Sequence, residues 1–417
     1  MPLSHSLRSV SSLLLGTALL MMGGGALSTV LAFRMGAAEQ PPWAVGMVMS
    51  MYYAGIVLGT GYGQKLIAGV GHIRAFVALG SMMSAATLAH AFLVDPWLWG
   101  ALRLLVGMCA VGMFMCTESW VNERSQNSTR GQIFALYQVT VYLAQGVGQF
   151  LINVPDESGF AVYLLMSILM SLAIVPVAVT KFQAPPLRPQ VRFQFLKLWE
   201  ISPTGMTIAF GCGVILGAFY GVGPLFAQLS GLDAERTARF MGAVIVGGLL
   251  LQWPVGKLSD RIDRRKVILF VAAGTAAACA WLMGLAANSG AALLLVGALF
   301  GGLSFTLYPL AVAYTFDYVR LEDLVPMSGG LIMAYGLGAA AGPAAASLTV
   351  FFGGAGGLFA FCGFIAFATA GFVIWRMTIR DALPIDDQSD FLAVPRTSQV
   401  IYEIDPRLDG AQGPLSG

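Results

Sequence analysis

The stretch Gly256–Ile268, "GKLSDRIDRRKVI", places seven charged residues within thirteen positions of a chain that is otherwise poor in charge. Only 11% of the 417 residues are Asp, Glu, Lys or Arg, whereas 57% are hydrophobic. A mean hydropathy of +0.76 leaves too little polar surface to cover a water-soluble globule of this length. The composition therefore indicates a membrane protein, and the charged stretch is expected to lie in water between two spans.

On both sides of this stretch, apolar runs long enough to cross a bilayer recur along the chain. A hydrocarbon core about 30 Å thick needs roughly 20 mostly apolar residues in one helix. The first run is too long to be the core of a signal peptide. Twelve spans are predicted, at residues 10–33, 43–67, 74–94, 97–121, 131–153, 160–180, 204–226, 237–257, 266–287, 291–315, 326–352 and 357–375. The predicted fold class is an all-α membrane protein.

Lysine and arginine residues give the orientation, because they accumulate in cytoplasmic loops. If the N-terminus is inside, only Arg34, Arg236 and Arg239 fall on the outer side, and Arg103 lies within a span. The other basic residues of the 23 then lie on the cytoplasmic side. Both termini are therefore predicted to be cytoplasmic.

The longest loop between spans divides them into two sets of six. This loop, residues 181–203, contains "APPLRPQVRF" and is predicted to be a cytoplasmic linker. It separates an N-terminal six-helix bundle, 1–180, from a C-terminal six-helix bundle, 204–375. Residues 376–417 form an acidic tail interrupted by prolines, a composition typical of chain without fixed structure.

The two halves repeat one another at their cytoplasmic joints. "GTGYGQKLIAGVGHIRAFV", residues 59–77, occupies the same place in the first half as "WPVGKLSDRIDRRKVILFV", residues 253–271, in the second. This six-plus-six repeat resembles the major facilitator superfamily of secondary transporters. The "ES…RG" and "TLYP" stretches are similar to an uncharacterised branch of bacterial inner-membrane transporters in that superfamily. The resemblance implies two pseudo-symmetric bundles in the inner membrane.

The resemblance also implies a role for the charged stretch, which matches the loop signature of the superfamily except that Asp263 replaces a glycine. In the superfamily the corresponding acid pairs with nearby basic side chains, next to the positive end of a helix, and holds the cytoplasmic side closed. A gating latch is therefore expected, with Asp260 and Arg261 at its centre. Its members are Gly256, Asp260, Arg261, Arg264 and Arg265. The alternative is that these charges only set the topology of the loop.

Two charged residues occur in the fourth predicted span. Charge within a bilayer is costly, so Arg103 is a candidate for binding an anionic group or steering protons. The alternative is an arginine whose donors are satisfied by backbone carbonyls of a neighbouring helix. Glu118 lies nearer the cytoplasmic end, where an ion pair with Arg124 or Arg130 is predicted.

The fifth span carries a polar stripe. Gln138, Tyr142, Gln145 and Gln149 follow one another at spacings of 4, 3 and 4, which places them on one helical face. Such a stripe either lines a cavity or joins neighbouring helices. Tyr220 and Tyr308 are second-half candidates for the same substrate cavity.

The resemblance predicts a secondary active transporter that moves a small solute across the bilayer by alternating access. A monomer is expected, and coupling to a proton gradient is one option. The alternative is a membrane sensor or assembly protein on a transporter fold, whose C-terminal tail recruits a partner. The sequence shows no metal-ligand set, nucleophile motif or phosphate loop, so neither an enzyme nor a cofactor is indicated. No basic, aromatic-rich face points to nucleic acid.

Overall fold

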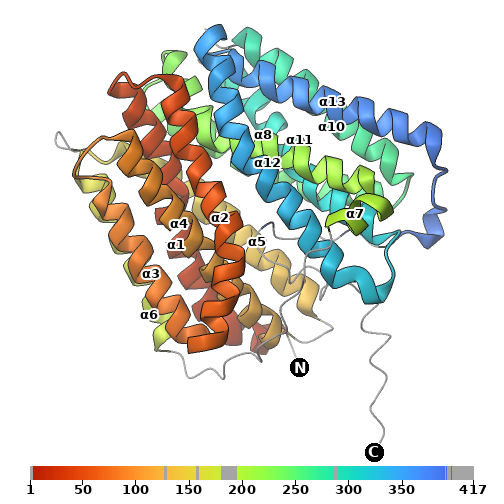
Figure 1. Ribbon diagram of the computed structural model, residues 1–417, viewed down its shortest axis with the longest axis horizontal. Coiled ribbons are helices and arrows are strands. Elements are labelled where there is room, and N and C mark those ends of the chain that lie inside the picture. The colour runs from red at the N-terminus through yellow and green to blue at the C-terminus, as the bar shows by residue number, and fades with distance from the viewer. Residues whose placement is uncertain are drawn as a thin grey trace, which may run out of the picture.

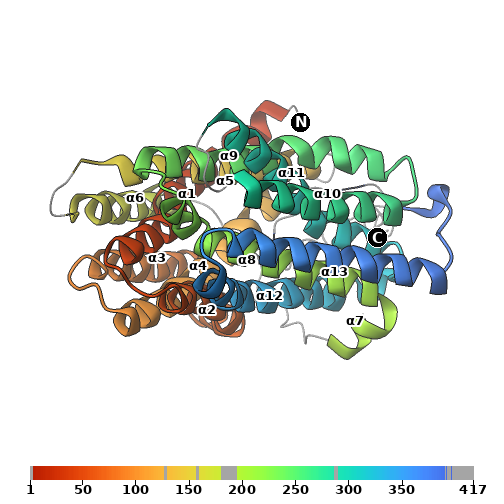
Figure 2. The same cartoon turned by 90° about the horizontal axis from the view of Figure 1, so that it is seen from above.

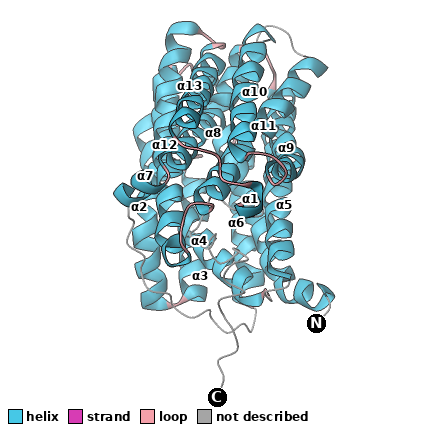
Figure 3. Ribbon diagram, turned by 90° about the vertical axis from the view of Figure 1, so that its right-hand side faces the viewer, coloured by secondary structure: helices cyan, strands magenta, loops and turns pink. Residues whose placement is uncertain are grey.

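The structure is a computed structural model, which describes residues 3–125, 129–155, 159–179, 195–285, 290–389, 391 and 396. The described residues form helices and loops, with no β-strand among them (Figure 3). The helices of the N-terminal half are α1 (Leu3–Ala37), α2 (Pro42–Val70), α3 (His72–Ala89), α4 (Pro96–Arg124), α5 (Arg130–Gly148), which the 3₁₀ turn η2 (Gln149–Asn153) continues, and α6 (Ala161–Ala178).

The C-terminal half repeats this arrangement. Its long helices are α8 (Pro203–Leu229), α9 (Ala234–Ser259), α10 (Arg264–Leu285), α11 (Ala291–Phe316), α12 (Leu324–Gly353) and α13 (Gly357–Ile379). This half also contains three short helical elements, α7 (Phe195–Ile201), η3 (Leu321–Asp323) and η4 (Ile385–Asp387). Each predicted span coincides with one long helix, so the predicted all-α fold in two six-helix bundles is confirmed.

Ten of the helices are long and apolar enough to cross a membrane, judged by length and composition. The two remaining long helices of the described chain, α3 and α5, are more polar. Helix α3 begins with His72 and Arg74, and α5 carries Gln138 and Gln145. These polar residues lower the mean hydropathy of the two helices. In α5 they face a cavity between the two halves, which is described below.

Glycines let the helices of each half cross closely. A Cβ atom on Gly55 would lie 2.1 Å from the carbonyl oxygen of Leu104, where α2 crosses α4. The second half has the same arrangement where α9 crosses α11, since a Cβ on Gly247 would lie 1.9 Å from the carbonyl oxygen of Ala298. Small residues thus bring backbones together at the same place in both halves, as expected within a membrane.

The two halves lie side by side and diverge toward the ends of the helices near the marked termini (Figure 1). Figure 2 shows the same two bundles from above. Between the halves, α2 packs on α12, α1 on α8 and α5 on α9. Close contacts occur near the outer ends: the backbone N–H of Ala344 donates to Ser50 Oγ at 3.1 Å, and Gly36 faces Gln228. The halves are therefore joined on the predicted outer side.

The linker and the tail differ from the expectation in the residues that the structure describes. Residues 195–201 of the predicted linker form helix α7, which the Lys197–Asp323 ion pair (2.5 Å) joins to η3. Helix α13 continues to Ile379, beyond the predicted end at 375. Ser389 and Phe391 of the tail make hydrogen bonds to the C-terminal half, so the tail is not without structure throughout. Residues 180–194 and most of 390–417 lie outside the described residues.

Candidate functional site

A cavity of about 170 Å³ lies between the two halves. Helices α1 to α5 contribute its wall from the N-terminal half, and α8 and α12 contribute from the C-terminal half. Beyond apolar residues, the wall carries hydroxyl and amide groups from Ser28, Tyr52, Tyr53, Tyr137, Gln138, Tyr142, Gln145, Tyr220 and Tyr335. A mostly apolar cavity with a few polar groups, placed between two domains, is the usual form of a small-molecule site.

Four of the predicted cavity residues lie on this wall. Gln138, Tyr142 and Gln145 line it from α5, and Tyr220 lines it from α8. The rings of Tyr142 and Tyr220 both approach Phe305 of α11, with centroid distances of 5.6 and 6.0 Å. The polar stripe of α5 therefore faces the other half rather than lipid.

Gln149, the last member of the stripe, holds helices together instead. It lies in η2, where its side-chain oxygen accepts a hydrogen bond from Thr29 Oγ1 at 2.5 Å. Its amide nitrogen donates to the backbone carbonyl of Gly25 at 3.2 Å. The helical spacing breaks at this point because α5 ends at Gly148, and Gln149 does not line the cavity.

Tyr308 also lies behind the wall. It is fully buried, and its ring packs against that of Tyr335 with the centroids 5.2 Å apart. Tyr335 itself lines the cavity. The predicted residue therefore supports a lining residue and is not itself exposed to the cavity.

Arg103 is buried next to the cavity, with only 1% of its surface exposed. Its Nη2 donates to Ser28 Oγ at 2.8 Å, and its guanidinium lies 4.4 Å from the centroid of the Tyr52 ring. Both partners line the cavity. The described partners of the Arg103 guanidinium are therefore the side chains of Ser28 and Tyr52, and these two side chains lie between Arg103 and the cavity.

Glu118, in the same helix as Arg103, is also fully buried. Its Oε1 accepts a hydrogen bond from the Tyr137 hydroxyl at 3.1 Å, and Tyr137 lines the cavity. Arg124 ends α4 and Arg130 begins α5. An ion pair between Glu118 and either arginine stays a prediction.

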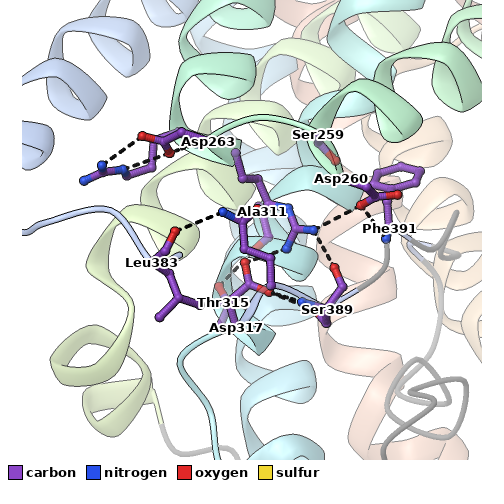
Figure 4. A network of polar contacts seen from close by, with 12 residues as sticks. Ser259, Asp260, Asp263, Ala311, Thr315, Asp317, Leu383, Ser389 and Phe391 are labelled. Atoms are coloured by element: carbon purple, nitrogen blue, oxygen red, sulfur yellow. Dashed lines mark hydrogen bonds and ion pairs between the residues drawn. The ribbon is translucent and has the colours of Figure 1, made fainter. Parts of the chain in front are cut away.

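The charged loop forms a polar cluster at the predicted cytoplasmic end of the C-terminal half (Figure 4). The guanidinium of Arg264 donates to Asp317 Oδ2 at 2.5 Å, to Asp260 Oδ1 at 3.3 Å and to the carbonyl of Ser389 at 2.6 Å. Ser389 in turn donates its N–H and hydroxyl to Asp317, each at 2.9 Å. The backbone N–H of Phe391 donates to Asp260 at 2.8 Å.

This geometry corrects one part of the predicted latch. Arg261 is exposed, whereas Arg264 forms an ion pair with Asp260 at 3.3 Å. The gating role of the latch stays a prediction. The cluster joins the loop to Asp317, at the end of α11, and to the tail. The ring of Phe391 lies against Gly256, where a Cβ would come within 2.2 Å of it. The resemblance placed Arg261 beside Asp260 at the centre of the latch. In the structure Asp260 follows the end of α9 and Arg264 begins α10, so the turn between the two helices brings Asp260 and Arg264 together.

Arg265 has a separate partner in the same loop. Its guanidinium donates two hydrogen bonds to Asp263, at 3.1 and 2.9 Å, and Nη1 donates to the carbonyl of Arg380 at 2.6 Å. Burial raises the pKa of the Asp263 carboxyl, but the hydrogen bonds from Arg265 outweigh this and hold the pKa below its ordinary value of 3.8. Asp263, which replaces the usual glycine, thus anchors Arg265.

Sequence reasoning missed several residues of the wall. Tyr52 and Tyr53 are adjacent in the middle of a span, a position that marks them as candidates in retrospect. Tyr335 has no polar neighbour in its helical register. Arg396, in the tail, reaches the cavity from outside any predicted span, and no local pattern indicates this.

Comparisons with known proteins agree with this fold. A family model, the Major Facilitator Superfamily, matches residues 240–394. An uncharacterized MFS-type transporter of Yersinia pestis (strain Pestoides F) is 28% identical over 353 residues, which cover 82% of this chain and 88% of that protein. The uncharacterized MFS-type transporter YcaD of Salmonella newport (strain SL254) is 27% identical over 350 residues, with 82% and 88% covered.

Solved structures show the same architecture. The nucleoside transporter NupG superposes with a TM-score of 0.69 at 12% identity, covering 88% of this chain and 99% of that one. A bacterial homolog of the human lysosomal transporter Spinster, in an inward-facing and unoccupied conformation, gives a TM-score of 0.72 at 11% identity, covering 92% and 100%. The predicted resemblance to the superfamily is confirmed.

Proposed function

We propose that this chain, which has the fold of the major facilitator superfamily, is a secondary active transporter that moves a small solute by alternating access. One observation carries the proposal: a cavity with hydroxyl and amide groups lies between two six-helix halves, and both halves contribute to its wall. A solute held by both halves couples its binding to their relative position. The bacterial relatives that share most of the chain carry the name of transporters.

The contacts between the halves favour a state open toward the cytoplasm. The halves meet near Ser50 and Ala344, on the side that the distribution of Lys and Arg assigns to the exterior. At the opposite ends, the polar cluster of Asp260, Arg264 and Asp317 joins elements of the C-terminal half and the tail. Because Lys and Arg gather on the side of the termini, we propose that both termini are cytoplasmic and that the protein lies in the bacterial inner membrane.

Transport then requires the two halves to rock about the cavity. Contacts such as the one between Ser50 and Ala344 break as the outer side opens, and the cytoplasmic ends approach one another. If a proton gradient drives this change, Glu118 is the candidate carrier, because it is buried and hydrogen-bonded to a wall residue, Tyr137.

A ligand screen followed by a flux assay tests the proposal. Compounds that raise the unfolding temperature of the purified protein are tested for counterflow into proteoliposomes. Gln145→Ala removes an amide from the wall and is expected to lower the initial rate about tenfold, the effect of losing one polar contact of about 1.4 kcal/mol. Gln132→Ala, an exposed position on the same helix, is the matched control and should transport normally.

Two outcomes would contradict the proposal. If stabilising compounds bind but none undergoes counterflow, the protein is a binding protein and not a transporter. If Gln132→Ala and Gln145→Ala transport equally, the cavity is not the solute site.

A further inference from the structure

The cavity already contains a cationic group, the guanidinium of Arg396. Arg396 Nη2 donates to the backbone carbonyl of Phe305 at 2.9 Å. Its guanidinium carbon lies 4.7 Å from the ring centroid of Phe305, 5.9 Å from that of Tyr142 and 6.0 Å from that of Tyr335. Three rings within about 6 Å of one cation form an aromatic cage.

The backbone carbonyl of Phe305, which accepts the hydrogen bond from Arg396, has no N–H partner within the helix, and the sequence shows why. Within a helix, the carbonyl of residue 305 would accept the N–H of residue 309. Residue 309 is proline, inside α11, and proline has no N–H. The "FTLYP" stretch thus leaves an unpaired acceptor at the cage, which suits a ligand with N–H donors.

The cage is formed by both halves. Tyr142 belongs to α5, whereas Phe305 and Tyr335 belong to α11 and α12. A cation bound there contacts both halves at once, as a transported solute must. Two other buried charged residues lie next to the cavity, the cation Arg103 and the anion Glu118. Each is separated from the cavity by a tyrosine, Arg103 by Tyr52 and Glu118 by Tyr137.

The charged loop holds the tail near the cage. Ser389 is bound by Arg264 and Asp317, and Phe391 is bound by Asp260 and packs on Gly256. These contacts lie within seven residues of Arg396. A ligand tethered so closely competes at a high effective concentration.

We propose that the cavity binds organic cations with a guanidinium or substituted ammonium group, and that Arg396 of the tail occupies the same cage as a tethered competitor. The proposal rests on the proposed function, because it names the solute class of that cavity. The proposal also assigns a second role to the charged loop, which is to position the tail.

Calorimetric titration of the full-length protein in nanodiscs tests this inference. The probes are phenylguanidinium, a cation at neutral pH, and phenylurea, a neutral molecule of similar shape. Wild-type protein should bind phenylguanidinium weakly, and Arg396→Gln should bind it about tenfold more tightly because the competitor is gone. Phenylurea should bind Arg396→Gln at least about tenfold more weakly than the cation does. Arg236→Gln, an exposed position on the opposite side, should behave as wild type.

A second variant tests the cage itself. Tyr335→Leu combined with Arg396→Gln should lose the gain in affinity for phenylguanidinium. Equal binding of the two probes by Arg396→Gln would overturn the proposed solute class. Binding of benzoate by the wild type that disappears in Arg396→Gln would show that Arg396 recruits anions, and would also overturn it. These are binding results, so a cation that binds without counterflow would refute transport and leave the site standing.

Discussion

Arg264 is buried to 99% at the predicted cytoplasmic end of the C-terminal half, together with Asp317. Removing one member of a buried ion pair destabilises a protein, because the charge that remains is isolated from water and has no partner. The carboxylate of Asp317 also binds the N–H and hydroxyl of Ser389. The pair therefore organises the tail as well as the end of α11.

Arg264→Gln should lower the free energy of unfolding by about 3–5 kcal/mol, because Asp317 is left buried without its cation. The double variant Arg264→Met/Asp317→Leu should recover most of this loss. Thermal unfolding of the purified variants measures both effects. A double variant as unstable as Arg264→Gln would show that the two charges are not coupled.

At the residue scale, the sequence identified groups that depend on helical periodicity. Gln138, Tyr142 and Gln145 lie on the cavity wall because a spacing of three or four residues suffices to place them on one face. The contact of Arg396 with the cavity and that of Arg264 with Asp317 join segments that are distant in the sequence. Such contacts are not encoded in any local pattern, which is why they were missed.

At the scale of elements, the crossing of α8 and α12 depends on glycines. A Cβ on Gly217 would lie 2.4 Å from the carbonyl oxygen of Ala339 and 2.7 Å from its Cα. Backbone atoms cannot move aside as a flexible side chain does. The crossing therefore tolerates no larger residue without a shift of one helix.

Gly217→Ala should destabilise the protein by about 1–3 kcal/mol through overpacking, and lower its unfolding temperature. Gly371→Ala, in α13, is the matched control, because no atom lies within 4 Å of the added Cβ. There the substitution should be neutral or stabilising by up to about 1 kcal/mol, from helix propensity alone. Equal unfolding temperatures for the two variants would contradict the close crossing.

The sequence predicted these elements well because a bilayer imposes one dominant constraint, a long apolar helix. It did not predict that α5 ends at Gly148 and continues as η2, since a change from α to 3₁₀ backbone leaves hydropathy unchanged. Helix α7 was not predicted either, for a related reason. Its seven residues lie in a linker, where hydrophobic periodicity over so short a length carries little information.

At the scale of the whole molecule, the proposed transport requires two arrangements of the same two halves. The structure shows contacts near the outer ends, at Ser50 with Ala344 and at Gly36 with Gln228. Glycines pack the helices of each half closely, so a change of state is expected to move the halves as bodies. Under the proposed alternating access, the cavity then opens to one side at a time.

Distances between spin labels measure this movement directly. One pair, Gln132→Cys with Lys257→Cys, reports on the cytoplasmic ends of α5 and α9, and a second, Ala38→Cys with Leu229→Cys, reports on the outer ends of α1 and α8. All four positions are exposed, whereas the five native cysteines are buried. In nanodiscs, with and without a stabilising compound from the screen, the cytoplasmic pair should gain a shorter distance as the outer pair gains a longer one. A single unchanged distance in both pairs under every condition would contradict alternating access.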